Sequence, residues 1–162
     1  MSRKPKEPAK TNALRELDAA GIPHQCHFLE VDEALSGVQA AQRLGLAPEG
    51  VFKTLVTQGR SGEHYVFMVP VAEELDLKKA AAAVGEKAIA MIPSRELLPL
   101  TGYVHGGCSP IGMRKQLRTV IDETAQLFDR ITFSGGRIGC HVTLAPSDLA
   151  ALIPLGQADL TA

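Results

Sequence analysis

The sequence predicts an α/β fold of the mixed, α+β-like kind: a single domain with a mixed, largely antiparallel sheet. This sheet is expected to curl toward a barrel, with short helices packed outside. About seven strand-like segments are interspersed with short helical ones. Several links between strands are hairpins, which are too short for parallel crossovers. The 162 residues, 45% hydrophobic and 22% charged, suit one domain with a substantial core. A doubly wound parallel sheet agrees less well with these short hairpin links.

The first half of the chain alternates helices with strands. Thr11 is a plausible N-cap for a helix through Ala20, which Gly21 ends. Ser36 can cap a second helix, through Leu44. The strands predicted for this half are 24–31, 51–58 and 64–71, with the hairpin signal 59–62 between the last two.

The second half continues with shorter elements. Asp76 can cap a helix over 77–84, and Ser94 can cap a short helix to residue 100. Segment 102–112 is too rich in Gly and Pro for regular structure. The remaining predicted strands are 88–92, 117–121, 130–133 and 138–144, and the remaining helical segments are 123–128 and 146–152.

Composition bounds the class of protein. The formal net charge of −1 does not indicate a nucleic-acid partner, so any such contact would need a local patch of basic residues. Segment 1–10 is basic, has no apolar region typical of a secretory signal, and is expected to be a flexible tail before a domain at 11–162. No apolar stretch approaches a membrane span. The three cysteines form no CxxC, which favours reduced thiols in the cytosol.

Lys53 is the most informative residue. Alternation in the strand 51–56 puts it on one face with Val51 and Leu55. A lysine on an apolar face is costly to desolvate, so it needs a partner or a purpose. On the strand alone, a lysine that reaches water from an edge strand is the more common explanation.

A glycine-rich loop is the second strong feature. Gly106 and Gly107 can turn backbone N–H groups toward a ligand and hold a developing oxyanion. Ser109 adds a hydroxyl. The structural alternative is a tight connection between two strands.

Two weaker motifs accompany this loop. Three cations directly after it make a local basic patch that could contact phosphates, or that is only a solvated charge run: Arg114, Lys115 and Arg118. The segment from Ser134 to Arg137 is a hairpin turn that could also place a hydroxyl and a guanidinium beside a pocket.

The cysteines and histidines suggest two sharper chemistries. Cys108 and His105 could form a nucleophile pair, but buried cysteine is common as an apolar filler. A metal site would draw on His24, Cys26, His27, His105, Cys108, Cys140 and His141. Their spacing matches no known ligand pattern.

Four segments, in this order, resemble one family. Residues 51–55 are similar to its lysine strand and 75–81 to the helix that follows. Residues 102–112 resemble its central loop, and 134–137 with 145–149 its C-terminal hairpin and helix. The family is the YbaK family of aminoacyl-tRNA deacylases, related to the editing domain of bacterial prolyl-tRNA synthetases. The resemblance covers about residues 12 to 155.

This resemblance implies a freestanding trans-editing enzyme of the cytoplasm that needs no metal or cofactor. Its substrate would be mischarged tRNA, foremost cysteinyl-tRNA(Pro), and its partners tRNA and prolyl-tRNA synthetase, with no DNA or membrane. The substrate thiol would attack its own ester, giving a cysteine thiolactone. Lys53, Gly106 and Gly107 would be the catalytic residues. The substrate-binding residues would be Thr54, Ser109, Ser134, Gly136 and Arg137.

Three alternatives stay open. The chain could deacylate another mischarged tRNA, carrying alanine or serine. It could be a non-catalytic module that binds tRNA or a synthetase through its basic segments. It could also be a hydrolase whose nucleophile is the Cys108 thiol.

Overall fold

A computed structural model describes residues 9–30 and 35–162. The basic segment 1–10 therefore lies outside the described residues, except for its last two positions, as does Val31 at the end of the first predicted strand. Within the described ranges no helix is long and apolar enough to cross a membrane.

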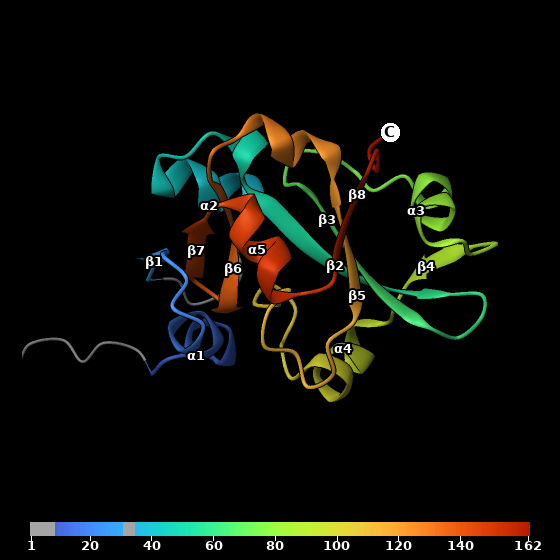
Figure 1. The fold of residues 1–162 in the computed structure, drawn as a ribbon, viewed down its shortest axis with the longest axis horizontal. Coiled ribbons are helices and arrows are strands. Elements are labelled where there is room, and N and C mark those ends of the chain that lie inside the picture. Colours follow the sequence, from blue (N-terminus) through green and yellow to red (C-terminus); the bar gives the residue numbers. More distant parts are fainter. Residues whose placement is uncertain (1–8, 31–34) are drawn as a thin grey trace, which may run out of the picture.

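Within these described residues, eight strands form two sheets (Figure 1). The smaller sheet has the order β1-β7-β6, and both of its pairs are antiparallel. The larger has the order β4-β2-β3-β5-β8, and its pairs β3-β5 and β5-β8 are parallel. The strand bounds are β1 Gln25–Phe28, β2 Phe52–Gly59, β3 His64–Pro70, β4 Ile89–Met91, β5 Arg118–Asp122, β6 Ile131–Arg137, β7 Cys140–Leu144 and β8 Leu155–Ala158.

In the part of the chain that the structure describes, five short α-helices pack around these sheets. Figure 1 shows α1 beside the smaller sheet and α3 at the opposite end of the molecule. The α-helices are α1 Asn12–Ala19, α2 Gly37–Leu44, α3 Leu77–Val84, α4 Ser94–Thr101 and α5 Pro146–Leu152, and the 3₁₀ helices are η1 Pro48–Gly50 and η2 Glu123–Leu127.

Helix ends follow the local signals in the sequence. Thr11 accepts the Leu14 N–H, Asp76 accepts two N–H groups, and Ser36 forms a capping box with Gln39. Gly45 ends α2 in the left-handed conformation that glycine adopts without strain. Ser94, expected as a cap, is instead the first residue of α4, whose N-cap is Pro93.

The mixed, largely antiparallel α/β fold is confirmed, with a division that the strand pattern does not reveal. The strands form two sheets and not one curled sheet, and β8 was not among the predicted strands. The first strand is also shorter than predicted, because only four residues pair with β7.

The larger sheet is buried on both faces. Its Phe52, Met68 and Ile121 meet the smaller sheet and helices α1 and α5 in one core cluster. Its Phe67 and Val69 meet α3 in a second cluster. Burial on both sides explains why β3 is nearly continuous in hydrophobic residues.

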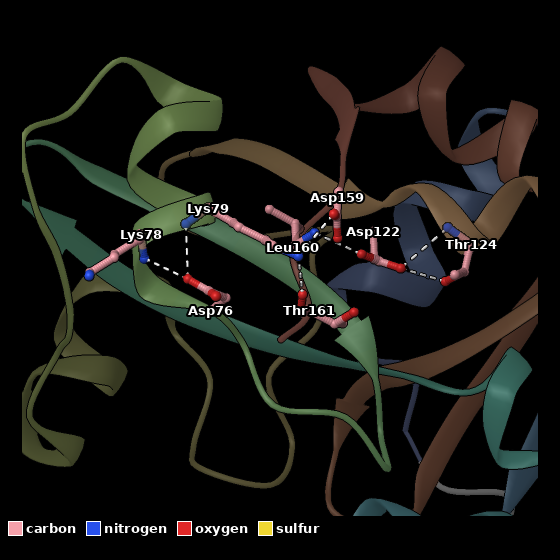
Figure 2. Close-up of polar contacts among 8 residues, drawn as sticks. All are labelled: Asp76, Lys78, Lys79, Asp122, Thr124, Asp159, Leu160 and Thr161. Carbon is pink, nitrogen blue, oxygen red and sulfur yellow. Dashed lines mark hydrogen bonds and ion pairs between the residues drawn. The ribbon is translucent and has the colours of Figure 1, made fainter.

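Polar contacts hold the C-terminal segment against the larger sheet (Figure 2). The buried Asp122 carboxylate accepts the Leu160 N–H at 2.9 Å and the Thr124 hydroxyl at 2.6 Å. Lys79 donates to Asp159 at 2.9 Å and to the Thr161 carbonyl at 2.6 Å. These contacts place β8 as the outer strand of the sheet.

Candidate active site

A cavity of about 430 Å³ opens where the two sheets meet. Its walls come from the start of β2, the beginning of α2, helix α4, the loop 105–108 and strands β6 and β7. This volume lies in the range of about 300–1,000 Å³ that ligand sites usually have. The cavity exists here because β4 pairs with β2 only at Thr57–Gly59. Along this edge, in the described part of the chain, the first half of β2 has no ladder partner. An isolated bridge joins Val51, just before β2, to Thr132.

Lys53 and Thr54 both line the cavity from β2. Lys53 pairs across the sheet with Val69, and Thr54 with Met68, so the two side chains start from opposite faces. Lys53 is half-buried, and no described residue offers it an ion-pair or hydrogen-bond partner. It is therefore a cation left available to an anionic ligand.

The Thr54 hydroxyl is the more unusual feature. Its Oγ1 is shielded from solvent and has no hydrogen-bond partner among the described residues. Buried polar atoms almost always have a partner, so an exception indicates a ligand or water that completes the site. Thr54 is thus placed to hydrogen-bond a molecule in the cavity.

The glycine-rich loop is held by its own side chains. The buried Tyr103 hydroxyl donates to the Ile111 carbonyl at 2.7 Å, and Ser109 Oγ accepts the Ile111 N–H at 3.3 Å. Ser109 is fully buried and does not line the cavity. Its hydroxyl therefore stabilises the loop in this structure, and the cavity-facing part of the loop is His105, Gly106 and Cys108.

Gly106 and Gly107 occupy different positions in a turn. The Gly107 N–H donates to the Val104 carbonyl at 3.0 Å, which closes a turn with Gly106 at φ +84°. Gly106 lines the cavity and Gly107 does not. The N–H groups of Gly106 and Cys108 make no hydrogen bond to any described residue. Both residues line the cavity, so these two N–H groups are available to a ligand.

Gly107 has a packing role that explains its lack of a side chain. A Cβ there would lie 2.8 Å from the Ile138 nitrogen and 3.0 Å from Arg137 Cα. The loop thus rests directly on the backbone of the β6–β7 turn. That contact sets the distance between Gly106 and the hairpin.

The hairpin contributes Ser134 to the cavity. Its Oγ also accepts the Gly136 N–H at 3.2 Å. Gly136 packs against Tyr103, with φ +102°, and the Arg137 guanidinium donates to the Ala9 carbonyl. Neither Gly136 nor Arg137 lines the cavity, so of this motif only Ser134 does.

The basic patch lies outside the cavity. Arg114, Lys115 and Arg118 are all exposed, and the Arg114 side chain lies over Gly102. Their exposure suits contact with an extended polyanion at the surface, and none of the three lines the cavity.

Cys108 is ill suited to act as a nucleophile. Burial raises the pKa of its thiol to about 12, because the thiolate would lose its hydration. No hydrogen bond joins it to His105 in the described structure. Among residues 9–30 and 35–162 there is also no group of three or more His, Cys, Asp and Glu side chains that could hold a metal ion.

For one cavity residue, the sequence predicts no role other than that of a candidate metal ligand. His141 lines the cavity and lies directly across from Ser134 in the β6–β7 pair. The turn predicted at 134–137 is wrong and would not have given this pairing, because the chain turns at Ile138 and Gly139, after a bulge between Ser134 and Arg137.

Taken together, the described lining of the cavity offers one cation, hydroxyls, imidazoles and free backbone N–H groups, with no carboxylate. It has no Ser-His-Asp arrangement. Such a site can hold an anionic or ester-bearing ligand and orient it, but it offers no ready nucleophile.

The chain belongs to the aminoacyl-tRNA editing domain family. The sequence model described as "Aminoacyl-tRNA editing domain" matches residues 32–152, which is more than half of the chain. The chain is also 39% identical, over 98% of its own length and 97% of the relative's, to an Enterococcus faecalis protein named "Putative Cys-tRNA(Pro)/Cys-tRNA(Cys) deacylase EbsC".

Two further likenesses agree with this family. The chain is 28% identical to a proline–tRNA ligase of Nautilia profundicola, over 86% of the chain but 23% of that larger protein. A solved structure, "Crystal structure of a putative trans-editing enzyme for prolyl tRNA synthetase", superposes with a TM-score of 0.82, 28% identity and 99% coverage of both chains.

Proposed function

We propose that this protein is a trans-editing deacylase that removes cysteine from mischarged tRNA(Pro). The observation that carries this proposal is the cavity, which joins an available lysine to unpartnered polar atoms and free loop N–H groups without a nucleophile. A substrate with its own thiol supplies what such a site lacks. The relative at 39% identity, whose name gives Cys-tRNA(Pro) and Cys-tRNA(Cys) as its substrates, supports a cysteinyl-tRNA substrate.

In this proposal Lys53 binds the phosphate or ester region of the terminal adenosine. The backbone N–H groups of Gly106 and Cys108 stabilise the developing oxyanion, and Thr54 and Ser134 orient the aminoacyl group. The substrate thiol, with a reference pKa of about 8.5, attacks its own ester carbonyl. The products are free tRNA and a cysteine thiolactone, which water then opens.

The proposal extends to partners and place. The acceptor end of tRNA is the ligand, and the exposed Arg114, Lys115 and Arg118 are candidates to contact its phosphates. A complex with prolyl-tRNA synthetase in the cytoplasm would deliver that tRNA. The domain responsible is 11–162.

The test is deacylation of a panel of mischarged tRNAs by the wild-type protein and by Lys53→Ala. We expect turnover of cysteinyl-tRNA(Pro), and a loss of about 10²-fold or more in the variant because the ester is no longer positioned. Lys78→Ala removes an exposed lysine on α3 and should leave the rate unchanged. Full activity of Lys53→Ala would refute the proposed site.

The panel also tests the aminoacyl group. Seryl-tRNA(Pro) should react far more slowly than cysteinyl-tRNA(Pro), because an alcohol is the weaker nucleophile. Equal rates would exclude attack by the substrate thiol. Preference for alanyl-tRNA would assign a different editing substrate, and binding without turnover would indicate a non-catalytic module.

A further inference from the structure

The wall that the smaller sheet gives to the cavity is a polar face built by strand alternation. Ser134 pairs with His141, and His141 pairs with His27, so these three side chains lie on one face of the sheet. The opposite face carries Phe133 and Val142 into the core. Ser134 and His141 line the cavity.

The His141 ring has no hydrogen-bond partner among the residues described. Its Nδ1 is shielded from solvent and unpaired, whereas Nε2 remains accessible. His27 differs, because its Nε2 lies 2.9 Å from Thr143 Oγ1, which is itself 2.6 Å from Thr132 Oγ1. The shielded Nδ1 indicates a water or ligand that supplies the missing partner, and the accessible Nε2 is left available to receive a proton.

The surroundings keep this imidazole neutral. Burial lowers the pKa of His141 below its usual 6.5, and the neighbouring His27 lowers it further. The other titratable groups around the cavity are Lys53 on β2 and His105 and Cys108 on the loop, with no carboxylate in the described lining. A neutral imidazole has a lone pair available to accept a proton at neutral pH.

We propose that His141 is the general base of the deacylation, accepting the proton of the substrate thiol at Nε2. This inference rests on the proposed function. As the proton moves to Nε2, the sulfur forms a bond to the ester carbonyl carbon. The tetrahedral intermediate then expels the 3′ oxygen of the tRNA, which takes the proton back from the imidazolium. The imidazole returns to its neutral form, and the products are tRNA and cysteine thiolactone.

Position separates His141 from the other candidates for this role. Cys108 is buried in its thiol form and has no proton-accepting capacity comparable to an imidazole. His105 is exposed on the turn. His141 alone among the described residues combines lining of the cavity, an unpaired ring and a direct pairing with Ser134.

The experiment measures single-turnover deacylation of cysteinyl-tRNA(Pro) between pH 6 and 9 for the wild type, His141→Ala and His141→Gln. At pH 7 we expect both variants to lose about 10²-fold, the usual contribution of a general base. The loss should shrink to a few-fold near pH 9, because the thiol, with a pKa of about 8.5, then ionises unaided. Added imidazole should restore part of the His141→Ala rate.

His64→Ala is the matched control, since His64 lies on β3 outside the cavity lining, and it should behave as the wild type. An unchanged rate and pH profile in either folded variant overturns the inference. A loss that is equal at every pH and insensitive to imidazole also overturns it, because that pattern indicates a structural role. Thermal melting shows which variants fold. If His141→Ala does not fold, His141→Gln still allows the test.

The outcomes also separate this inference from the proposed function. A wild-type protein that does not deacylate cysteinyl-tRNA(Pro) refutes the proposed function itself. A wild-type protein whose turnover depends on Lys53 but not on His141 leaves that function standing and rejects only the base.

Discussion

Thr54 carries a buried hydroxyl that the fold leaves without a hydrogen-bond partner among the described residues. Its strand neighbour Thr57 is fully buried and donates from Oγ1 to the Tyr65 carbonyl at 2.9 Å. Thr54 has no such bond for its own buried Oγ1. An unsatisfied buried hydroxyl costs free energy, so folding alone does not favour threonine at this position.

Replacing Thr54 by valine, which has nearly the same shape, should therefore separate the effect on stability from the effect on the deacylation rate. We expect the free energy of unfolding to stay the same or rise by up to about 1 kcal/mol, while deacylation slows about tenfold. Thr57→Val is the control, and should lose about 1 kcal/mol with an unchanged deacylation rate. Urea denaturation and single-turnover kinetics measure both. A Thr54→Val protein that is fully active would show that the hydroxyl has no part in the site.

At the scale of elements, the site depends on how the loop 102–112 rests on the β6–β7 hairpin. Tyr103 holds the loop through the Ile111 carbonyl and packs against Gly136 of the hairpin. Gly107 allows the two backbones to meet. The atom nearest to a Cβ at this position would be the main-chain nitrogen of Ile138, which can move only if the hairpin backbone moves. Ser134 and Gly106 lie at the same cavity because of this contact.

Gly107→Ala should therefore damage both stability and activity. The added Cβ would force the loop and hairpin apart, and we expect a clear fall in melting temperature together with loss of deacylation. Gly62→Ala is the comparison, since Gly62 has φ +96° with nothing within 4 Å of a Cβ. It should suffer only backbone strain of about 1–2 kcal/mol, without a change in rate. Similar behaviour of the two variants would contradict the close-contact explanation.

At the scale of the whole molecule, the larger sheet needs its last strand to complete it. Strand β8 pairs in parallel with β5, and the chain beyond it returns to Leu75 through an isolated bridge at Thr161. Asp122 binds the Leu160 backbone from inside the fold, at 1% exposure (Figure 2). Fully buried Leu160 thereby covers the cluster around α3.

Asp122→Ala should weaken the attachment of β8 and the C-terminal residues to the larger sheet. The Leu160 N–H and the Thr124 hydroxyl lose their shared acceptor, so we expect a loss of about 2–3 kcal/mol and a melting temperature lower by about 5–10 °C. Deacylation well below that temperature should persist, because Asp122 does not line the cavity. Asp159→Asn removes only an ion pair with Lys79 whose side chains are 38% and 55% exposed, and should change little. Equal effects of the two changes would contradict the structural role of Asp122.

Much of this architecture was predictable from local signals. Caps at Thr11, Ser36 and Asp76, and the hairpin after β2, depend on residues a few positions apart. The turn after β6 lies later than predicted, because a bulge carries the strand on to Arg137. Strand β8 was missed because Leu155–Ala158 is short and contains Gly156, and its parallel partner lies more than thirty positions earlier. Its pairing becomes favourable only once the rest of the sheet exists.

The candidate site likewise has features that the sequence predicts and features that only the tertiary structure decides. The sequence by itself determined the family, through the order of its motifs, and with it the choice of Lys53, Gly106 and Ser134 as site residues. Tertiary structure alone decided which of the chosen groups reach the cavity: Ser109 and Gly107 support the loop, while Thr54 and His141 carry unpaired polar atoms. The physical reason is that hydrogen-bond satisfaction and close backbone contact are properties of distant segments brought together, which no local pattern records.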